Sequence, residues 1–361
     1  MSPFARIAGA LAISAIVLSL LVACERDAES PAKPDQNGPS LTLSGAGSSF
    51  AAPIFNKWIE VYGAEHPDLG LSYASVGSGE GIERFLAGGS DIGATDAPLR
   101  PAEAAALNGQ FVQIPVTAGM IAITYNLPGV RAPLNLPRDV YADIFLGKID
   151  RWSDPRIAAA NPGVDLPHKL IQVVARSDGS GTTFAFTNHL SAISADWAKG
   201  PGVGKLIDWP GGAMVARGNE GVAQRVKITE GAIGYVEAGF AQRLHLPLAW
   251  LENRAGGLIA PNAETGRRAL AGGSNAIPDD LALVITDPSG APSYPIVTYT
   301  WALLRKEYDS PEKTEAVRQL MRWALTDGQS YAEGLWYVPL PDNVVQGALR
   351  ELRLVGGADA P

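Results

Sequence analysis

Three short loops in the sequence combine glycine with serine or threonine, the residue types that surround small anions. They read Gly45-Ala-Gly-Ser-Ser-Phe50, Gly77-Ser-Gly-Glu-Gly81 and Gly179-Ser-Gly-Thr-Thr-Phe184. Each lies between a predicted strand and a predicted helix, so it leaves free N–H groups at a helix N-terminus, where the dipole favours negative charge. Taken singly, each loop is more typical of an ordinary capped helix. If the three loops converge in the fold, they would together enclose a small tetrahedral anion.

Charged residues beside these loops extend the anion hypothesis. Arg176 precedes the third loop, where a guanidinium can bind two oxygens of an anion, and Asp178 is placed to pair with it. Asp96 follows a short predicted strand, and Asp178 and Asp96 are otherwise typical of turns and caps. A carboxylate in an anion site can accept the proton that phosphate keeps near neutral pH, whereas sulfate has no such proton and would be repelled.

Several other kinds of site are not supported. The sequence lacks the phosphate loop of nucleotide hydrolases, the dinucleotide fingerprint and the serine-hydrolase elbow. Its four histidines are scattered and it holds one cysteine, so we expect no metal site, no cofactor and no catalytic residue. The net charge of −8 argues against a nucleic-acid partner.

The elements that would position these residues alternate as in an α/β protein. The pattern predicts a helix with Ile54, Phe55, Trp58, Val61 and Tyr62 on one face. A late helix starts at Pro311, and residues 252–280 are predicted to be irregular. The chain of 361 residues, 46% of them apolar, is long enough for two domains and excludes a disordered protein. Strands are predicted at residues 41–44, 71–76, 92–94, 120–125, 171–175, 232–236 and 296–304.

The amino terminus has the pattern of an export signal. Residues 1–23 carry Arg6 and then an apolar stretch, which predicts a secretory signal peptide. The stretch ends in Leu-Val-Ala-Cys24, which resembles the bacterial lipobox and implies lipidation of Cys24. Residues 24–40 are polar and contain proline, as expected of a flexible tether. The alternatives are a plain signal peptide with an incidental cysteine, and an uncleaved anchor.

Together these residues closely resemble the PstS-type phosphate-binding proteins of bacterial phosphate ABC importers. The resemblance covers about residues 41–354 and includes Trp58. Its most specific parts are the Arg-x-Asp-Gly-Ser-Gly-Thr run from Arg176 and the Gly-Ala-Thr-Asp-Ala-Pro-Leu run around Asp96. It also covers Ile144-Phe-Leu-Gly-Lys-Ile-Asp-Arg-Trp152, Gly231-Ala-Ile-Gly-Tyr-Val-Glu237 and Tyr337-Val-Pro-Leu-Pro-Asp342.

The resemblance implies a role for individual residues. Asp96 would accept the phosphate proton, Arg176 would form the ion pair, and Asp178 would orient Arg176. Glu80 departs from the family pattern, and we expect its side chain to point to solvent. The residues implied to bind phosphate are Ser49, the backbone N–H of Phe50, Ser78, Asp96, Arg176, Ser180, Gly181 and Thr182.

The resemblance also implies a two-lobed, type II-like periplasmic binding protein with the ligand buried between hinged lobes. One lobe would comprise residues 41–116 and 293–361 and the other residues 117–292, with crossings near residues 115–119 and 293–296. The implied function is high-affinity binding of inorganic phosphate and its delivery to the membrane subunits of an ABC importer. We expect a non-enzymatic monomer, exported and held at a bacterial membrane through Cys24, in the periplasm or at the cell surface.

Three alternatives remain from the sequence. A phosphate sensor or scavenger without transport would carry the same binding residues. A phosphate-ester hydrolase would need a nucleophile or a metal beside the anion. A receptor for another oxyanion, such as sulfate or molybdate, is disfavoured by Asp96.

Overall fold

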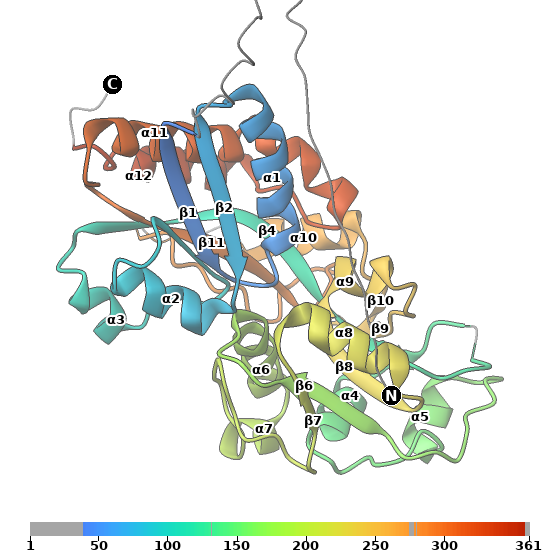
Figure 1. The fold of residues 1–361 in the computed structure, drawn as a ribbon. Coiled ribbons are helices and arrows are strands. Elements are labelled where there is room, and N and C mark those ends of the chain that lie inside the picture. The colour runs from blue at the N-terminus through green and yellow to red at the C-terminus, as the bar shows by residue number, and fades with distance from the viewer. Residues whose placement is uncertain (1–38, 131, 274–277, 279, 358–361) are drawn as a thin grey trace, which may run out of the picture. The chain divides into compact units, whose positions relative to one another are not determined.

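The computed structural model describes residues 39–130, 132–273, 278 and 280–357 (Figure 1). The predicted signal peptide, Cys24 and nearly all of the predicted tether lie outside these ranges. Within them, no helix is both long and apolar enough to cross a bilayer.

The fold is built on a mixed sheet of eight strands, in the order β2-β1-β3-β11-β4-β8-β6-β7. At one end β1 runs parallel to β2 and β3, and at the other β6 runs parallel to β7 and β8. The antiparallel strands β11 and β4 join the two groups. The strands are β1 (Leu41–Gly47), β2 (Leu69–Ser75), β3 (Ile92–Thr95), β4 (Phe111–Tyr125), β6 (Gln172–Arg176), β7 (Met214–Ala216), β8 (Ala232–Glu237) and β11 (Val297–Arg305).

Strand β4 belongs to both parts of the sheet. Its residues 111–120 pair with β11, and its residues 121–125 pair with β8. All of its residues except Phe111 are buried, as expected of a strand covered on both faces. The sequence pattern predicted only the second half of this strand.

The missed half of β4 contains Pro115, which cannot donate a ladder hydrogen bond. Trp301 lies opposite Pro115 while Thr300 lies opposite Thr117, so Val116 is the extra residue of a β-bulge. The proline is therefore accommodated where the ladder is already interrupted.

Four helices follow the parallel strands and cover the sheet. They are α1 (Ala52–Glu65) after β1, α2 (Ser78–Leu86) after β2, α6 (Gly181–Ile193) after β6 and α8 (Gly218–Ile228) after β7. Helix α1 buries Ile54, Phe55, Trp58 and Tyr62, which confirms the predicted face, although Val61 is only partly buried. The carboxyl ends of parallel strands are where α/β folds form ligand sites, and the three glycine loops are at these ends.

The remaining elements are helices, two 3₁₀ turns and a small second sheet. The late helix begins at Pro311 as predicted, and the Ser310 side chain caps it by accepting a hydrogen bond from the N–H of Lys313. A small second sheet has the order β10-β9-β5. These elements are α3 (Pro101–Ala106), β5 (Asn135–Leu136), α4 (Arg138–Phe145), α5 (Pro155–Ala160), α7 (Ala195–Lys199), α9 (Ala238–Arg243), β9 (Trp250–Glu252), β10 (Leu258–Ile259), α10 (Ala263–Gly273), α11 (Pro311–Leu325), the 3₁₀ turns η1 (Asp327–Tyr331) and η2 (Glu333–Leu335), and α12 (Asp342–Leu352).

The prediction of irregular structure over residues 252–280 was wrong in part, because α10 lies within it. The buried face of α10 consists only of Gly266, Ala269 and Leu270. A Cβ at Gly266 would come within 2.6 Å of the Val338 side chain, so this face must be small. The prediction was based on the glycine, alanine, asparagine and proline content of this segment rather than on its periodicity, which is why it missed the helix.

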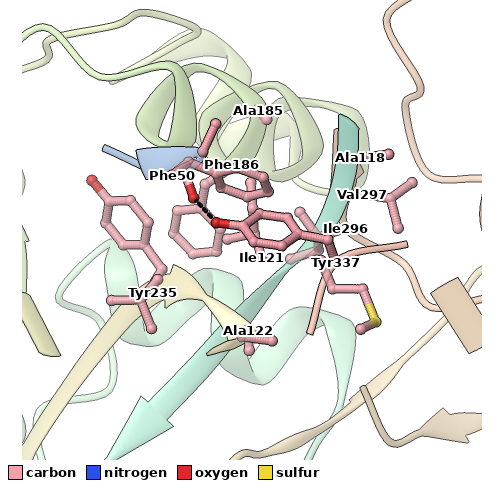
Figure 2. Close-up of a cluster of buried hydrophobic side chains, with 14 of the residues drawn as sticks. Phe50, Ala118, Ile121, Ala122, Ala185, Phe186, Tyr235, Ile296, Val297 and Tyr337 are labelled. Atoms are coloured by element: carbon pink, nitrogen blue, oxygen red, sulfur yellow. Dashed lines mark hydrogen bonds between the residues drawn. The ribbon is translucent and has the colours of Figure 1, made fainter. Parts of the chain in front are cut away.

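An aromatic part of the core includes Phe50 of the first glycine loop (Figure 2). Phe186 of α6 stacks on Tyr235 of β8 with ring centroids 4.4 Å apart. Phe50 of the first loop meets Tyr337 edge-on, and the Tyr337 hydroxyl donates a hydrogen bond to the Phe50 carbonyl. The first loop is thereby fixed to the core through Phe50.

Candidate anion-binding site

The second and third glycine loops meet backbone to backbone. The N–H of Gly79 donates a hydrogen bond of 2.7 Å to the carbonyl of Gly179. A Cβ at Gly181 would lie 2.6 Å from the Cβ of Asp96 and 2.6 Å from the Oγ of Ser78. Gly181 therefore cannot carry a side chain unless its neighbours move, and a Cβ at Gly79 or Gly179 would make a tight contact of 3.0 or 3.1 Å with the facing loop.

Asp96 lies just past β3 and is 1% exposed. Ser48 Oγ lies 2.6 and 2.7 Å from its two carboxylate oxygens, and Thr300 Oγ1 donates to Oδ1 at 2.6 Å. Ser78 Oγ is more distant, at 3.4 Å from Oδ2, and accepts the Asp96 N–H. Burial raises the pKa of Asp96 to about 6, although these hydroxyls and the charge of Arg176 act in the opposite direction.

Arg176, the last residue of β6, is 2% exposed. Its Nε and Nη2 donate to the two carboxylate oxygens of Asp178 at 2.8 and 2.5 Å. Burial acts to raise the pKa of Asp178, but the hydrogen bonds and charge of Arg176 outweigh it and lower the pKa. A guanidinium has five N–H donors, so this pair leaves Nη1 and one Nη2 donor for another acceptor. Among the described residues, Nη1 makes one hydrogen bond, a long one of 3.5 Å to Thr182 Oγ1.

The third loop begins helix α6. Ser180 is its N-cap, and its Oγ accepts the N–H of Thr183 at 3.0 Å. Thr183 in turn lies 2.6 Å from the hydroxyl of Tyr235, which also accepts the N–H of Arg176. The aromatic core of Figure 2 therefore supports both the loop and the arginine.

Asn219, in the first turn of α8, joins the first loop to the third. Its backbone N–H and its Nδ2 both donate to Ser49 Oγ, at 3.1 and 3.0 Å. Nδ2 also donates to Thr182 Oγ1 at 3.1 Å, and Oδ1 accepts the N–H of Glu237 at 2.9 Å. Asn219 is fully buried.

The structure brings the sequence-predicted residues together. Apart from Asp178, whose side chain is 11% exposed, the side chains that line this region are at most 2% exposed. Contacts through Asp96, Asn219 and Gly181 connect the three loops. The residues gathered there are Ser49, Phe50, Ser78, Asp96, Arg176, Asp178, Ser180, Gly181 and Thr182, with Asp178 at the edge.

Sequence reasoning missed Ser48, Asn219 and Thr300. Ser48 lies inside the first loop, so the same glycine-serine pattern could have identified it. Asn219 lies in Arg217-Gly-Asn-Glu-Gly221, a fourth glycine-containing strand-to-helix junction whose signal was present. Thr300 comes from the middle of β11 beside the bulge, and no local pattern marks it.

Glu80 lies at the surface, where its carboxylate pairs with Arg84 and Arg217. Its side chain is 36% exposed. Hydrogen bonds from Arg84, and then from Arg217, lower its pKa. The expectation that Glu80 faces solvent rather than the anion site agrees with this position.

Glu237, the last residue of β8, is a second buried carboxyl group near the site. Its Oε1 accepts the N–H of Gly239 at 2.8 Å, whereas Oε2 is buried with no hydrogen-bond partner among the described residues. Burial raises the pKa of Glu237 to about 8, with the charge of Asp96 adding to the shift and that of Arg243 opposing it. No cluster of metal-ligating side chains occurs within the ranges that the structure describes.

The chain matches the family model of the PBP superfamily domain over residues 32–328. The phosphate-binding protein PstS of Pasteurella multocida (strain Pm70) is 42% identical over 306 residues, which cover 84% of this chain and 88% of that protein. The phosphate-binding protein PstS of Haemophilus influenzae is 40% identical over 305 residues, which cover 84% of this chain and 90% of that protein.

Solved structures with the same fold include phosphate-binding proteins. PfluDING, a high-affinity periplasmic phosphate-binding protein bound with phosphate, has a TM-score of 0.69 at 20% identity and covers 86% of this chain and 93% of its own. A phosphate-binding protein from Stenotrophomonas maltophilia has a TM-score of 0.69 at 20% identity. The match covers 85% of this chain and 93% of that protein. The predicted α/β fold of a periplasmic binding protein is confirmed.

The close approach at Gly181 predicts the effect of adding one methyl group there. Gly181→Ala must displace Asp96 or Ser78, so we expect it to lower the free energy of unfolding by about 1–3 kcal/mol, measured by urea denaturation. Gly334→Ala is the control, because a Cβ there meets nothing within 4 Å. Equal stabilities of the two variants would contradict this account of the loop contact.

The burial of Glu237 predicts a pH-dependent stability difference. A carboxyl group whose pKa is raised by folding stabilises the protein below its unfolded pKa and loses that contribution as pH rises through the folded pKa, here about 8. Glu237→Gln stays neutral, so its stability relative to the wild type should increase from about pH 5 to about pH 8. A difference in unfolding free energy that stays constant over this range would show that Glu237 does not titrate as proposed.

Proposed function

The chain belongs to the PBP superfamily and, within it, to the PstS family of phosphate-binding proteins, and on this basis we propose that it binds inorganic phosphate for delivery to an ABC-type importer. The binding site is the junction of the three glycine loops. The protein acts as a receptor and catalyses no reaction.

One observation about hydrogen bonds carries this proposal. The hydroxyl protons of Ser49, Ser180 and Thr182 have no acceptor among the described residues, although all three side chains are at most 2% exposed. Buried donors need an acceptor, and unused N–H groups of Arg176 lie beside Thr182. Several converging donors around one guanidinium fit a small anion with four oxygens.

The proposed ligand contacts follow from these donors. Arg176 forms the ion pair, held in orientation by Asp178. Ser49 and the N–H of Phe50 bind from the first loop and Ser78 binds from the second. The third loop contributes Ser180, Gly181 and Thr182.

Asp96 gives the site its selectivity. The acceptor oxygens of Asp178 are taken up by Arg176, so Asp96 is the carboxylate proposed to take the hydrogen bond of a protonated phosphate oxygen. Sulfate carries no proton and would leave two anions in contact inside a buried site. Such an unpaired contact costs several kcal/mol, enough for selection of about 10⁴-fold.

The site lies where two lobes meet. We assign residues 41–116 and 293–361 to one lobe and residues 117–292 to the other. In support, β4 changes its pairing partner from β11 to β8 between Met120 and Ile121, and the Ile121 N–H donates to the Ile296 carbonyl. The two crossing segments are thus neighbours, as a hinge requires.

Export and anchoring are supported by the sequence alone. Residues 1–23 act as a lipoprotein signal peptide, and Cys24 becomes the lipid-modified residue. Residues 24–40 tether the receptor, a monomer, to a bacterial membrane beside the importer's membrane subunits.

Titration calorimetry at about pH 8 tests the function. We expect one phosphate to bind per chain and an excess of sulfate not to displace it. In Asp96→Asn the amide can donate to a sulfate oxygen, so the ratio of phosphate to sulfate affinity should fall at least roughly tenfold. Sulfate competing equally with phosphate in the wild type would overturn the role of Asp96, and turnover of phosphate esters by the pure protein would overturn the receptor function.

Arg176→Ala tests whether the guanidinium is in the site. Its loss leaves the anion without its ion pair, so phosphate affinity should fall by about 2 kcal/mol or more, or roughly 30-fold. Arg156→Ala is the control, since Arg156 pairs with Asp143 at the surface. Unchanged affinity in Arg176→Ala would place the anion elsewhere.

A further inference from the structure

The surroundings of Asn219 allow only one orientation of its side-chain amide. The backbone N–H of Glu237 is a donor and points at the amide from 2.9 Å, so the amide oxygen must face it. The NH₂ group therefore faces the opposite side, where Ser49 and Thr182 lie. Its two N–H donors match these two hydroxyl oxygens.

The contacts of Asn219 determine what the Ser49 hydroxyl can do. A hydroxyl has two acceptor sites and one donor proton. Both acceptor sites of Ser49 are occupied by N–H groups of Asn219, one from the backbone and one from the side chain. Only the proton remains, so Ser49 can bind a ligand solely as a donor.

Thr182 is restricted in the same way. Its Oγ1 accepts from Nδ2 of Asn219 at 3.1 Å and receives the long contact from Arg176 Nη1. Its proton, like that of Ser49, has no acceptor among the described residues.

We propose that Asn219 is a positioning residue, which occupies the acceptor sites of the Ser49 and Thr182 hydroxyls and so makes both of them donors to the bound anion. The inference rests on the proposed phosphate site and deepens it. It also removes Ser49 and Thr182 as acceptors for a ligand proton, which agrees with the acceptor role proposed for Asp96.

The same contacts relate hydroxyl orientation to the two assigned lobes. Asn219 and Thr182 belong to residues 117–292, whereas Ser49 belongs to the other lobe. Separation of the lobes would remove both donors from Ser49 and leave its hydroxyl free to rotate. Ser49 is therefore oriented as a donor only when the lobes are together.

Asn219→Asp isolates this role. The aspartate keeps the size of the side chain and the acceptor for Glu237, but replaces the NH₂ group with an oxygen that attracts the two hydroxyl protons. We expect inorganic phosphate to bind at least roughly 100-fold more weakly at about pH 8, measured by calorimetry. Part of any loss will come from repulsion between the new charge and the anion, so the single variant is not sufficient.

A double-mutant cycle separates the two contributions. Charge repulsion lowers phosphate affinity by the same factor whether or not the Ser49 hydroxyl is present. Reorientation of the Ser49 hydroxyl can lower the affinity only when that hydroxyl is present. The loss caused by Asn219→Asp should therefore be at least roughly tenfold smaller in the Ser49→Ala background, and smaller again when Thr182→Val is added. Equal losses in all backgrounds would overturn the proposal.

Controls distinguish this inference from the proposed function and from misfolding. Asn161→Asp places the same charge at another buried asparagine, 3% exposed and bonded to residues 135 and 157, and should leave phosphate affinity unchanged. If thermal unfolding shows that Asn219→Asp does not fold, the same cycle is measured with Asn219→Ala. The proposal then requires that Asn219→Ala lowers phosphate affinity less in the Ser49→Ala background than in the wild type. A wild type that binds no phosphate would refute the proposed function, whereas additive losses in a protein that binds phosphate would refute only the role of Asn219.

Discussion

A guanidinium buried from water is the constraint around which this site is arranged. Removing a charge from water is costly unless it is paired and its remaining donors are satisfied. Asp178 satisfies two donors of Arg176, and Nη1 lies 3.5 Å from Thr182 Oγ1 in the third glycine loop. Asp178 is itself held by the N–H of Gly218 at the start of α8. The position of Arg176 at the end of β6 thus determines where the loops from both parts of the sheet must meet.

The balance of donors and acceptors resolves an apparent contradiction. The chain carries a net charge of −8 and yet belongs to a family of anion receptors. Binding in a buried site depends on local groups more than on total charge, because solvent and salt screen distant charges. In this region the donors left unused by the Arg176–Asp178 pair and several hydroxyl groups lie close to Asp96.

The sequence predicted most of the parallel strands, α1, α11 and the three loops. The periodic spacing of apolar residues and the glycines at turns are signals that can be read within a short stretch of chain. It also predicted Arg176 and Asp178 as a pair, since Asp178 lies only two positions after Arg176. It did not predict Thr300 beside Asp96, because that contact depends on a bulge in β4 and a pairing across some two hundred residues of chain. Likewise, the small residues of α10 make sense only once Val338 is known to lie against them.

The position of β11 between β3 and β4 has a consequence for how the molecule is made. Residues 297–305 fill the gap between strands that are synthesised some two hundred residues earlier. Until then β3 and β4 each have an open edge able to pair with another chain. The protein therefore completes its sheet only after residue 305 has been synthesised, and a chain cut short before residue 297 would keep two exposed edges.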